Sequence, residues 1–225
     1  MKATWRLRGG ALVLVLAAAM GCNPLTSVYF MMFGVENKVP PEFQLASADK
    51  EVTVLILAYT APGVQTGQVG VDRLLGTEIA RQLQERCQYN KEKVKIVPIH
   101  KVEKFKSDHP GWKTMGPTEI GRQFDADSVV DLEVAALSLY EPGSHKTLYK
   151  GRCKIDINVF DMKKPQDGKV FAKSFSTEYP QTRGPIPVAD DNNPEKFRDM
   201  FVKRIATDIC WQFTAHLSEE QYQCD

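Results

Sequence analysis

The sequence lacks the motifs that most enzymes and metal sites would show. Its 225 residues contain no Gly-x-Ser-x-Gly elbow, no His-Glu-x-x-His, no Walker loop and no protein-kinase motif set. The histidines are far apart, without ligand spacing, at His100, His109, His145 and His216. We therefore expect a protein that is not an enzyme, with no cofactor and no bound metal.

Two weaker patterns have simpler explanations. Gly63, Gly67 and Gly70 precede a predicted helix, whose first amides could bind an anion, but no Gly-Lys-Thr ending follows and a flexible loop explains them better. The residues of the Asp-Asp-Asn-Asn cluster at 190–193 could attract Ca²⁺, but they lack the glycine and the bidentate glutamate of an EF-hand loop. Capping of the next helix explains them more simply.

An excess of charge of one sign is also missing. Without Lys2, Arg6 and Arg8, which belong to an expected export signal, 26 basic residues stand against 28 acidic ones. No dense basic stripe remains, so we expect no binding to nucleic acid. Hydrophobic residues make up 43% of the chain, which is enough for a compact core.

The N-terminus has the layout of a secretory signal peptide, with three basic residues in 1–8 and a wholly apolar run at 11–19. That run is too short to span a bilayer, which takes about 20 helical residues. The sequence Ala19-Met20-Gly21-Cys22 resembles the bacterial lipobox, although Ala19 and Met20 are looser matches than Gly21. The resemblance implies cleavage after residue 21 and lipidation (diacylglycerol, palmitate) of Cys22.

The alternative is a spanning anchor that joins this run to the apolar residues 28–33. Pro24 lies between the two runs, where it would cost a continuous helix about 3 kcal/mol. We therefore prefer the lipoprotein interpretation, and either one attaches the same domain to a membrane.

Four further cysteines remain, an even number for an oxidising compartment: Cys87, Cys153, Cys210 and Cys224. We favour a disulfide between Cys210 and Cys224, because it would fix a loose tail to the last helix. Free buried thiols at Cys87 and Cys153 are the alternative to a second disulfide. No Cys-x-x-Cys pair suggests zinc or redox chemistry.

Patterning predicts a linker over residues 22–50, one domain over 51–217 and a tail over 218–225. The β-rich apolar run 51–59 predicts a central strand, followed by a helix over 71–86 and a parallel strand over 94–97. An irregular loop is expected over 107–115.

Pro117 predicts the start of a short helix over 117–124. Strands over 128–139, 147–160 and 169–178, separated by turn sequences, predict an antiparallel meander. Asn193 and Pro194 then predict the start of a final helix, whose apolar stripe runs every four residues from Phe197 to Phe213. The fold class is therefore α/β (α+β), with a mixed sheet of about five strands.

This order of elements after a lipobox resembles a domain shared by three envelope proteins. They are the N-terminal part of the Tol translocation protein, the curli secretion lipoprotein and the outer-membrane activators of penicillin-binding proteins. The run Glu119-Ile120-Gly121 and the run Ala126-Asp127-Ser128-Val129-Val130 look like that family's passage from helix to strand. The resemblance, over about residues 51–217, implies protein–protein contact in the envelope without catalysis. The chain departs from the family in lacking a pore-forming insertion.

From these observations we expect a membrane-tethered adaptor or accessory subunit of an envelope assembly, with its domain in the periplasm. Because Asn23 is not the aspartate that many bacteria read as an inner-membrane signal, we expect the outer membrane. Trp112 and Tyr140, on predicted loops, are candidate contacts for a partner. The alternatives are a small-ligand or glycan-binding lipoprotein and an unrecognised hydrolase.

Overall fold

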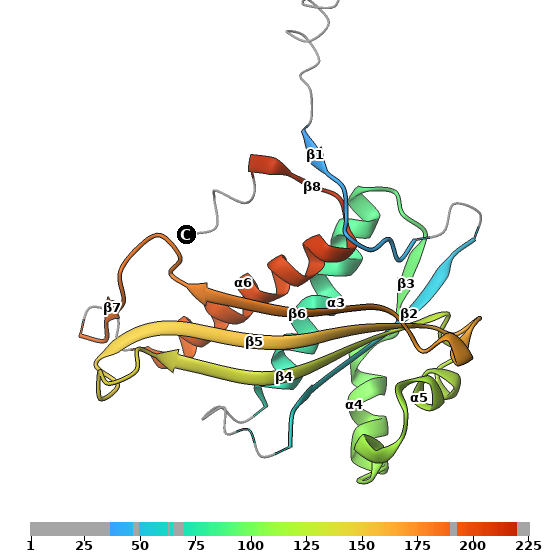
Figure 1. Cartoon of the computed structure of the whole chain (residues 1–225), viewed down its shortest axis with the longest axis horizontal. Helices are drawn as coiled ribbons and strands as arrows, with labels where there is room; N and C mark the ends of the chain where they lie inside the picture. The colour runs from blue at the N-terminus through green and yellow to red at the C-terminus, as the bar shows by residue number, and fades with distance from the viewer. Residues whose placement is uncertain (1–36, 47–49, 63, 65–69, 190–192, 220–225) are drawn as a thin grey trace, which may run out of the picture. The chain divides into compact units, whose positions relative to one another are not determined.

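The structure, a computed structural model, describes residues 37–46, 50–62, 64, 70–189 and 193–219 (Figure 1). The expected signal peptide, Cys22 and the apolar run 28–33 lie outside these residues. The chain divides into two compact units, residues 1–38 and 39–225, and the fold below is that of the second. Within the described ranges, no helix is both long enough and apolar enough to cross a bilayer.

One mixed sheet of six strands organises the unit, and its main path runs β3-β2-β4-β5-β6. Strand β2 is parallel to both of its neighbours, β3 and β4, whereas β4, β5 and β6 form an antiparallel meander. The strands are β2 (Val52–Thr60), β3 (Val94–Ile96), β4 (Ser128–Tyr140), β5 (Leu148–Asp161), β6 (Lys169–Tyr179) and β7 (Ile186–Pro187), the last of which pairs with β5. The predicted mixed α/β fold and its meander are confirmed.

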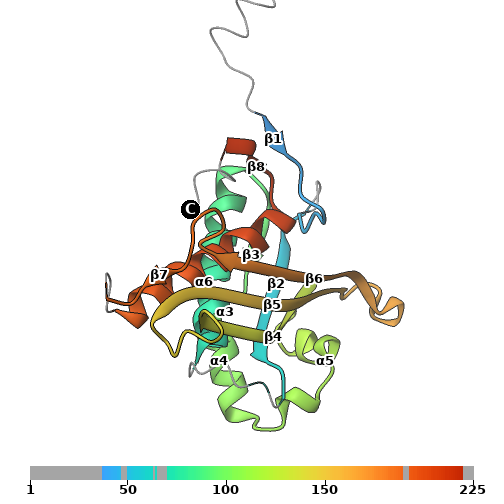
Figure 2. The same ribbon diagram turned by 60° about the vertical axis from the view of Figure 1, so that its left-hand side comes forward.

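Two long helices cover one face of this sheet, α3 (Val71–Tyr89) and α6 (Pro194–Phe213) (Figure 2). Each places an apolar stripe against the strands, including Ile79 and Leu83 of α3 and Phe201 and Ile205 of α6. The predicted cap of α6 is confirmed, since Asn193 Oδ1 accepts a hydrogen bond from the Lys196 backbone at 3.0 Å. This side of the sheet holds the main core, and we call it the helix-covered face.

The opposite face is covered only in part, by α4 (Ile99–Asp108), a 3-10 turn η1 (Trp112–Thr114) and α5 (Pro117–Gln123). They enclose a small second core over β2 and the start of β4, which contains Leu55, Leu57, Val97, Val102, Trp112, Ile120, Ala126 and Val129. Because β2 carries buried residues on both faces, its continuous apolar run predicted a central strand correctly.

Helix α4 was not predicted, and the expected loop over 107–115 is in fact the end of α4 and η1. The helix is only ten residues long and fully buries one side chain, Val102, so its apolar signal in the sequence is weak. The short elements β1 (Lys38–Val39), β7, β8 (His216–Leu217) and η2 (Pro165–Asp167) were also not anticipated.

Part of the segment expected to be a linker packs against the domain. Leu45 is buried in the main core, and the Phe43 ring lies 5.4 Å from the ring of Phe171. The Phe43 N–H donates to the carbonyl oxygen of Gln212 at 2.9 Å. We expected the domain to begin at residue 51, whereas the compact unit begins at Val39.

Candidate functional site

The face opposite α3 and α6 has a second part, beyond the small core, that carries polar side chains and that we call the open face. Cross-strand pairing arranges its side chains in rows of three across β4, β5 and β6. Starting from the small core, the rows are Asp131-Asn158-Ala172, Glu133-Asp156-Ser174, Ala136-Lys154-Ser176 and Ser138-Arg152-Glu178.

A bulge in β4 shapes this arrangement. The pairing of β4 with β5 shifts between Val134 and Ala136, so one extra residue enters β4 at that point. Before the shift Asp131 and Glu133 face the open side, and after it Ala136 and Ser138 do, until a second shift that follows Ser138. The bulge therefore places the small side chains of Ala136 and Ser138 on the open face, while Leu137 is buried on the other.

The last two rows line a trough of about 640 Å³ that is open to solvent. Its lining includes Ala136, Ser138, Arg152, Lys154, Ser176 and Glu178, with Val64 and Gln181 at its margins. Ala136 and Ser138 of β4 and Ser176 of β6 are small, exposed side chains of the trough, and Lys154 and Arg152 of β5 lie between them.

Arg152 is the most distinctive side chain in the trough. Its Nη2 donates to Glu141 Oε2 at 2.8 Å, and its Nε lies 3.7 Å from Glu178 Oε2. Its Nη1 is shielded from solvent and has no hydrogen-bond partner among the described residues. A buried donor without an acceptor costs about 1–3 kcal/mol, so an incoming carbonyl or carboxylate oxygen would find a favourable place here.

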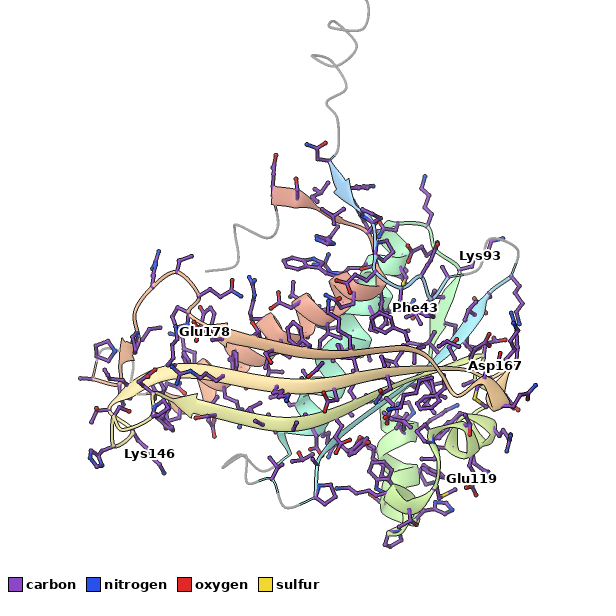
Figure 3. All side chains as sticks on the ribbon, viewed as in Figure 1. Phe43, Lys93, Glu119, Lys146, Asp167 and Glu178 are labelled. Carbon is purple, nitrogen blue, oxygen red and sulfur yellow. The ribbon has the colours of Figure 1, made fainter. Side chains whose placement is uncertain are left out.

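Lys150 stabilises the same end of the sheet without contributing to the trough. Its ammonium is almost fully buried, donates to the carbonyl oxygen of Pro180 at 2.6 Å and lies 3.3 Å from Glu178 Oε1. Glu178 is thus held between Lys150 and Arg152, at the end of the sheet where Figure 3 also shows Lys146.

A second group of polar residues lies in the rows nearer the small core. The Tyr59 hydroxyl donates to Glu133 Oε2 at 3.4 Å, and Asn158 Nδ2 donates to Asp131 Oδ2 at the same distance. Burial, with a smaller contribution from Glu133, raises the pKa of Asp131 to about 6. Because Asp131 is only 5% exposed, a substrate has little access to it, and its raised pKa follows from packing.

Among the residues that the structure describes, no group of three or more His, Cys, Asp or Glu side chains could hold a metal ion. Of the cluster at residues 190–193, only Asn193 is described, and it caps α6. The glycines Gly63 and Gly67 lie outside the described residues. Gly70 adopts a positive φ of 72° immediately before α3, a backbone conformation that favours glycine.

The aromatic candidates from the sequence lie elsewhere. The Trp112 side chain is 9% exposed and meets the Tyr59 ring edge-on at 5.6 Å, so it presents little surface to a partner. Tyr140 is half-buried and stacks on Tyr149, with ring centroids 5.4 Å apart. Neither lines the trough, and the sequence reasoning missed Arg152. The alternating basic residues of β5 were the available signal.

The described cysteines Cys87, Cys153 and Cys210 are buried free thiols. Burial raises the pKa of Cys153 and of Cys210 to about 12, and it also raises the pKa of Cys87. The Cys210 thiol donates to the carbonyl oxygen of Ile79 at 3.7 Å. Cys224, the partner expected for a disulfide with Cys210, lies outside the described residues.

Comparison with known proteins gives only distant likenesses. No family model matches the chain, and no curated protein matches it. Among solved structures, lipoprotein GNA1162 from Neisseria meningitidis is 13% identical, with a TM-score of 0.43 over 70% of this chain and 97% of that one.

Two further structures show similar values. PelC from Paraburkholderia phytofirmans, a dodecamer, is 11% identical, with a TM-score of 0.42 over 78% of this chain and 96% of that one. A putative neuraminyllactose-binding hemagglutinin homolog from Helicobacter pylori is 10% identical, with a TM-score of 0.41 over 83% of this chain and 96% of that one.

Proposed function

We propose that this chain is a lipid-anchored, non-enzymatic adaptor of the bacterial envelope that holds an extended segment of a partner protein in the trough. The observation that carries the proposal is Arg152, which lines the trough and whose Nη1 is shielded from solvent and has no acceptor among the described residues. An extended peptide offers a carbonyl oxygen at every residue, and arginine is enriched at protein interfaces.

The shape of the trough supports a chain-like occupant. Its lining comes from three strands, with small side chains on β4 and β6, and Lys154 and Glu178 add one charge of each sign beside Arg152. The envelope location is supported by the lipobox resemblance of residues 19–22, and the outer membrane remains part of the proposal. Kinship with the Tol, curli and penicillin-binding-protein activator domains is also proposed.

The anchor is tested by intact mass of the full-length product purified from membranes, beside a Cys22→Ala variant, each with and without reductant. We expect loss of residues 1–21 and gain of acyl chains, both dependent on Cys22. A loss of about two mass units that reductant restores would report a disulfide. An unprocessed, unacylated chain would reject lipidation and favour the spanning anchor.

The trough is tested by photo-crosslinking in intact cells. A photoreactive residue replaces Ala136 or Ser138, or replaces Glu119 on α5 as a control, which lies far from Glu178 (Figure 3). We expect one adduct of the same mass at both trough positions and none at the control. Arg152→Ala should abolish the adduct, whereas Lys95→Ala should not. Absence of adducts at both trough positions in folded protein would reject the proposal.

The volume of the trough favours one other candidate function, because small-molecule sites span about 300–1,000 Å³. A lipoprotein that binds a small ligand or glycan would bind a carboxylate-bearing sugar at Arg152. A saccharide panel that gives saturable thermal stabilisation, lost in Arg152→Ala, would favour this function over the adaptor.

A further inference from the structure

Strand β6 forms a long free edge of the sheet. It contains eleven residues, about 36 Å of extended chain, and is the outermost strand beside β5 (Figures 1 and 2). Within the described part of the chain, its backbone groups make hydrogen bonds only to β5. Alternate N–H and C=O groups along its outer side therefore offer a template for another strand.

Natural sheets protect such edges with proline, β-bulges, inward-pointing lysine or very short strands. Of these, β6 has a bulge near its start, between Lys169 and Phe171, and an inward-pointing lysine, Lys173, whereas its residues 171–179 pair regularly with β5. It contains no proline and is rich in residues that favour strands. Lys173, at its centre, is already engaged: its Nζ lies 2.6 Å from Glu42 Oε1 and 2.6 Å from Gln212 Oε1. That ammonium is held on the helix-covered side, away from the open face.

The sequence of β6 is complementary to itself in an antiparallel arrangement. With Ser174 facing Ser174 of a second copy, Ala172 faces Ser176, so only small, exposed side chains meet at the centre of the open face. Lys169, near one end of the strand, comes close to Glu178 at the other end of the second copy, so the ends carry opposite charges. If the two strands were shifted by one residue, exposed side chains of one copy would lie opposite half-buried side chains of the other.

We infer that β6 pairs antiparallel with β6 of a second copy about a two-fold axis at Ser174, which joins both sheets into one. Such an interface is isologous, which means that both chains contribute the same surface, as in the two-fold dimers that are the commonest oligomers. The two troughs then lie on the same side of the joined sheet, because Ser176 and Glu178 contribute to each. The inference rests on the edge of β6 and does not depend on what the trough binds.

Cysteine trapping tests the register. Residues directly opposite in an antiparallel pair have Cα atoms about 4.5–5.5 Å apart, which suits a disulfide. In the full chain with Cys224→Ser, we expect Ser174→Cys to form a covalent dimer under mild oxidation. Ala172→Cys alone and Ser176→Cys alone should form none, because their symmetry mates lie about 13 Å apart along the strand. A mixture of these two variants should crosslink.

The background chain should form no crosslink, because the described native cysteines are buried and a lipidated Cys22 carries its sulfur in a thioether. If Ser174→Cys gives no more dimer than Ala172→Cys or Ser176→Cys, the proposed register is wrong. If none of the four samples crosslinks, the pairing itself is overturned.

A variant with an added charge tests the association without covalent crosslinking. Ser174→Lys sets two ammonium groups against each other across the axis, and like charges directly opposite destabilise strand pairs. By sedimentation in detergent, the wild-type chain should have twice the protomer mass, and Ser174→Lys should weaken dimerisation at least about tenfold. Gln123→Lys on α5 adds the same charge at an exposed site and should leave the dimer intact.

Equal weakening by both lysine variants would assign the effect to net charge and overturn the inference. So would a wild-type chain that is monomeric at all concentrations, in which case a partner's strand is the remaining occupant for the edge. Thermal unfolding of Ser174→Lys should match that of Gln123→Lys, since both side chains are exposed.

Discussion

The two faces of the sheet carry different kinds of side chain and are packed differently. On the helix-covered face, aromatic rings interlock: Tyr149 stacks on Phe197 at 4.6 Å, and the Phe201 ring lies against the backbone of Gly151. On the open face, rows of polar side chains lie on the same three strands with no comparable apolar cover. One set of strands thus provides a dry core on one side and an accessible recognition surface on the other.

The difference shows where substitutions are tolerated. A buried face is close-packed, so small changes in volume alter the free energy of unfolding. An exposed face loses little on substitution, so its side chains are available for binding. The following predictions test this contrast, from the largest effect to the smallest.

Phe201→Ala should have the largest effect. The side chain is fully buried in the main core, and truncation of a buried phenylalanine costs about 3–5 kcal/mol. Urea denaturation should show a midpoint far below that of the wild type, with a similar slope. A loss under about 1 kcal/mol would mean that α6 is not packed as tightly as its contacts indicate.

Asp131→Asn should stabilise the protein near neutral pH. The pKa of Asp131 is raised from 3.8 to about 6, so the folded state binds its proton more tightly than the unfolded state does. Stability from this group is present below about pH 4 and is lost as the pH rises through about 6. The shift corresponds to roughly 3 kcal/mol at pH 7 as an upper bound.

Denaturation at pH 4 and at pH 7 tests this. The asparagine variant should gain stability over the wild type only at the higher pH. Glu119→Gln, at an exposed position on α5, provides the control and should change neither value. Equal effects of Asp131→Asn at both pH values would contradict the titration of this carboxyl.

Gly151→Ala should cost about 1–3 kcal/mol, because a Cβ at residue 151 would lie 2.7 Å from Phe201 Cδ1. Its matched control is Gly184→Ala, where a Cβ would meet nothing within 4 Å. Thermal unfolding of both variants gives the comparison. If the two variants have the same melting temperature, α6 must be able to move away from β5 without loss of stability.

Lys154→Gln should have the smallest effect on stability, within about 0.5 kcal/mol, because the side chain is exposed on the open face. Chemical denaturation beside the wild type measures it. A larger loss of stability would show that side chains on the open face contribute to the stability of the fold. The two sides of the sheet would then differ less than proposed.

Much of the fold could be predicted because its signals are local. The apolar run of β2, the four-residue stripe of α6 and the turn sequences of the meander are each contained within a short stretch of chain. Helix α4 escaped prediction, since a short helix with one fully buried residue leaves little periodicity. Trp112 looked like a loop contact, but the small core that buries it is assembled from segments far apart in sequence.

The sequence by itself determined the composition, the order of the main elements, the apolar stripes that form the main core, and the lipobox-like segment before the domain. Only the tertiary structure decided which residues share the open face. The bulge in β4 changes the alternation of its side chains, and pairing then brings Ser138, Arg152 and Glu178 into one row. Such a row depends on register between distant strands, which is fixed by packing of the whole sheet and which no local pattern encodes.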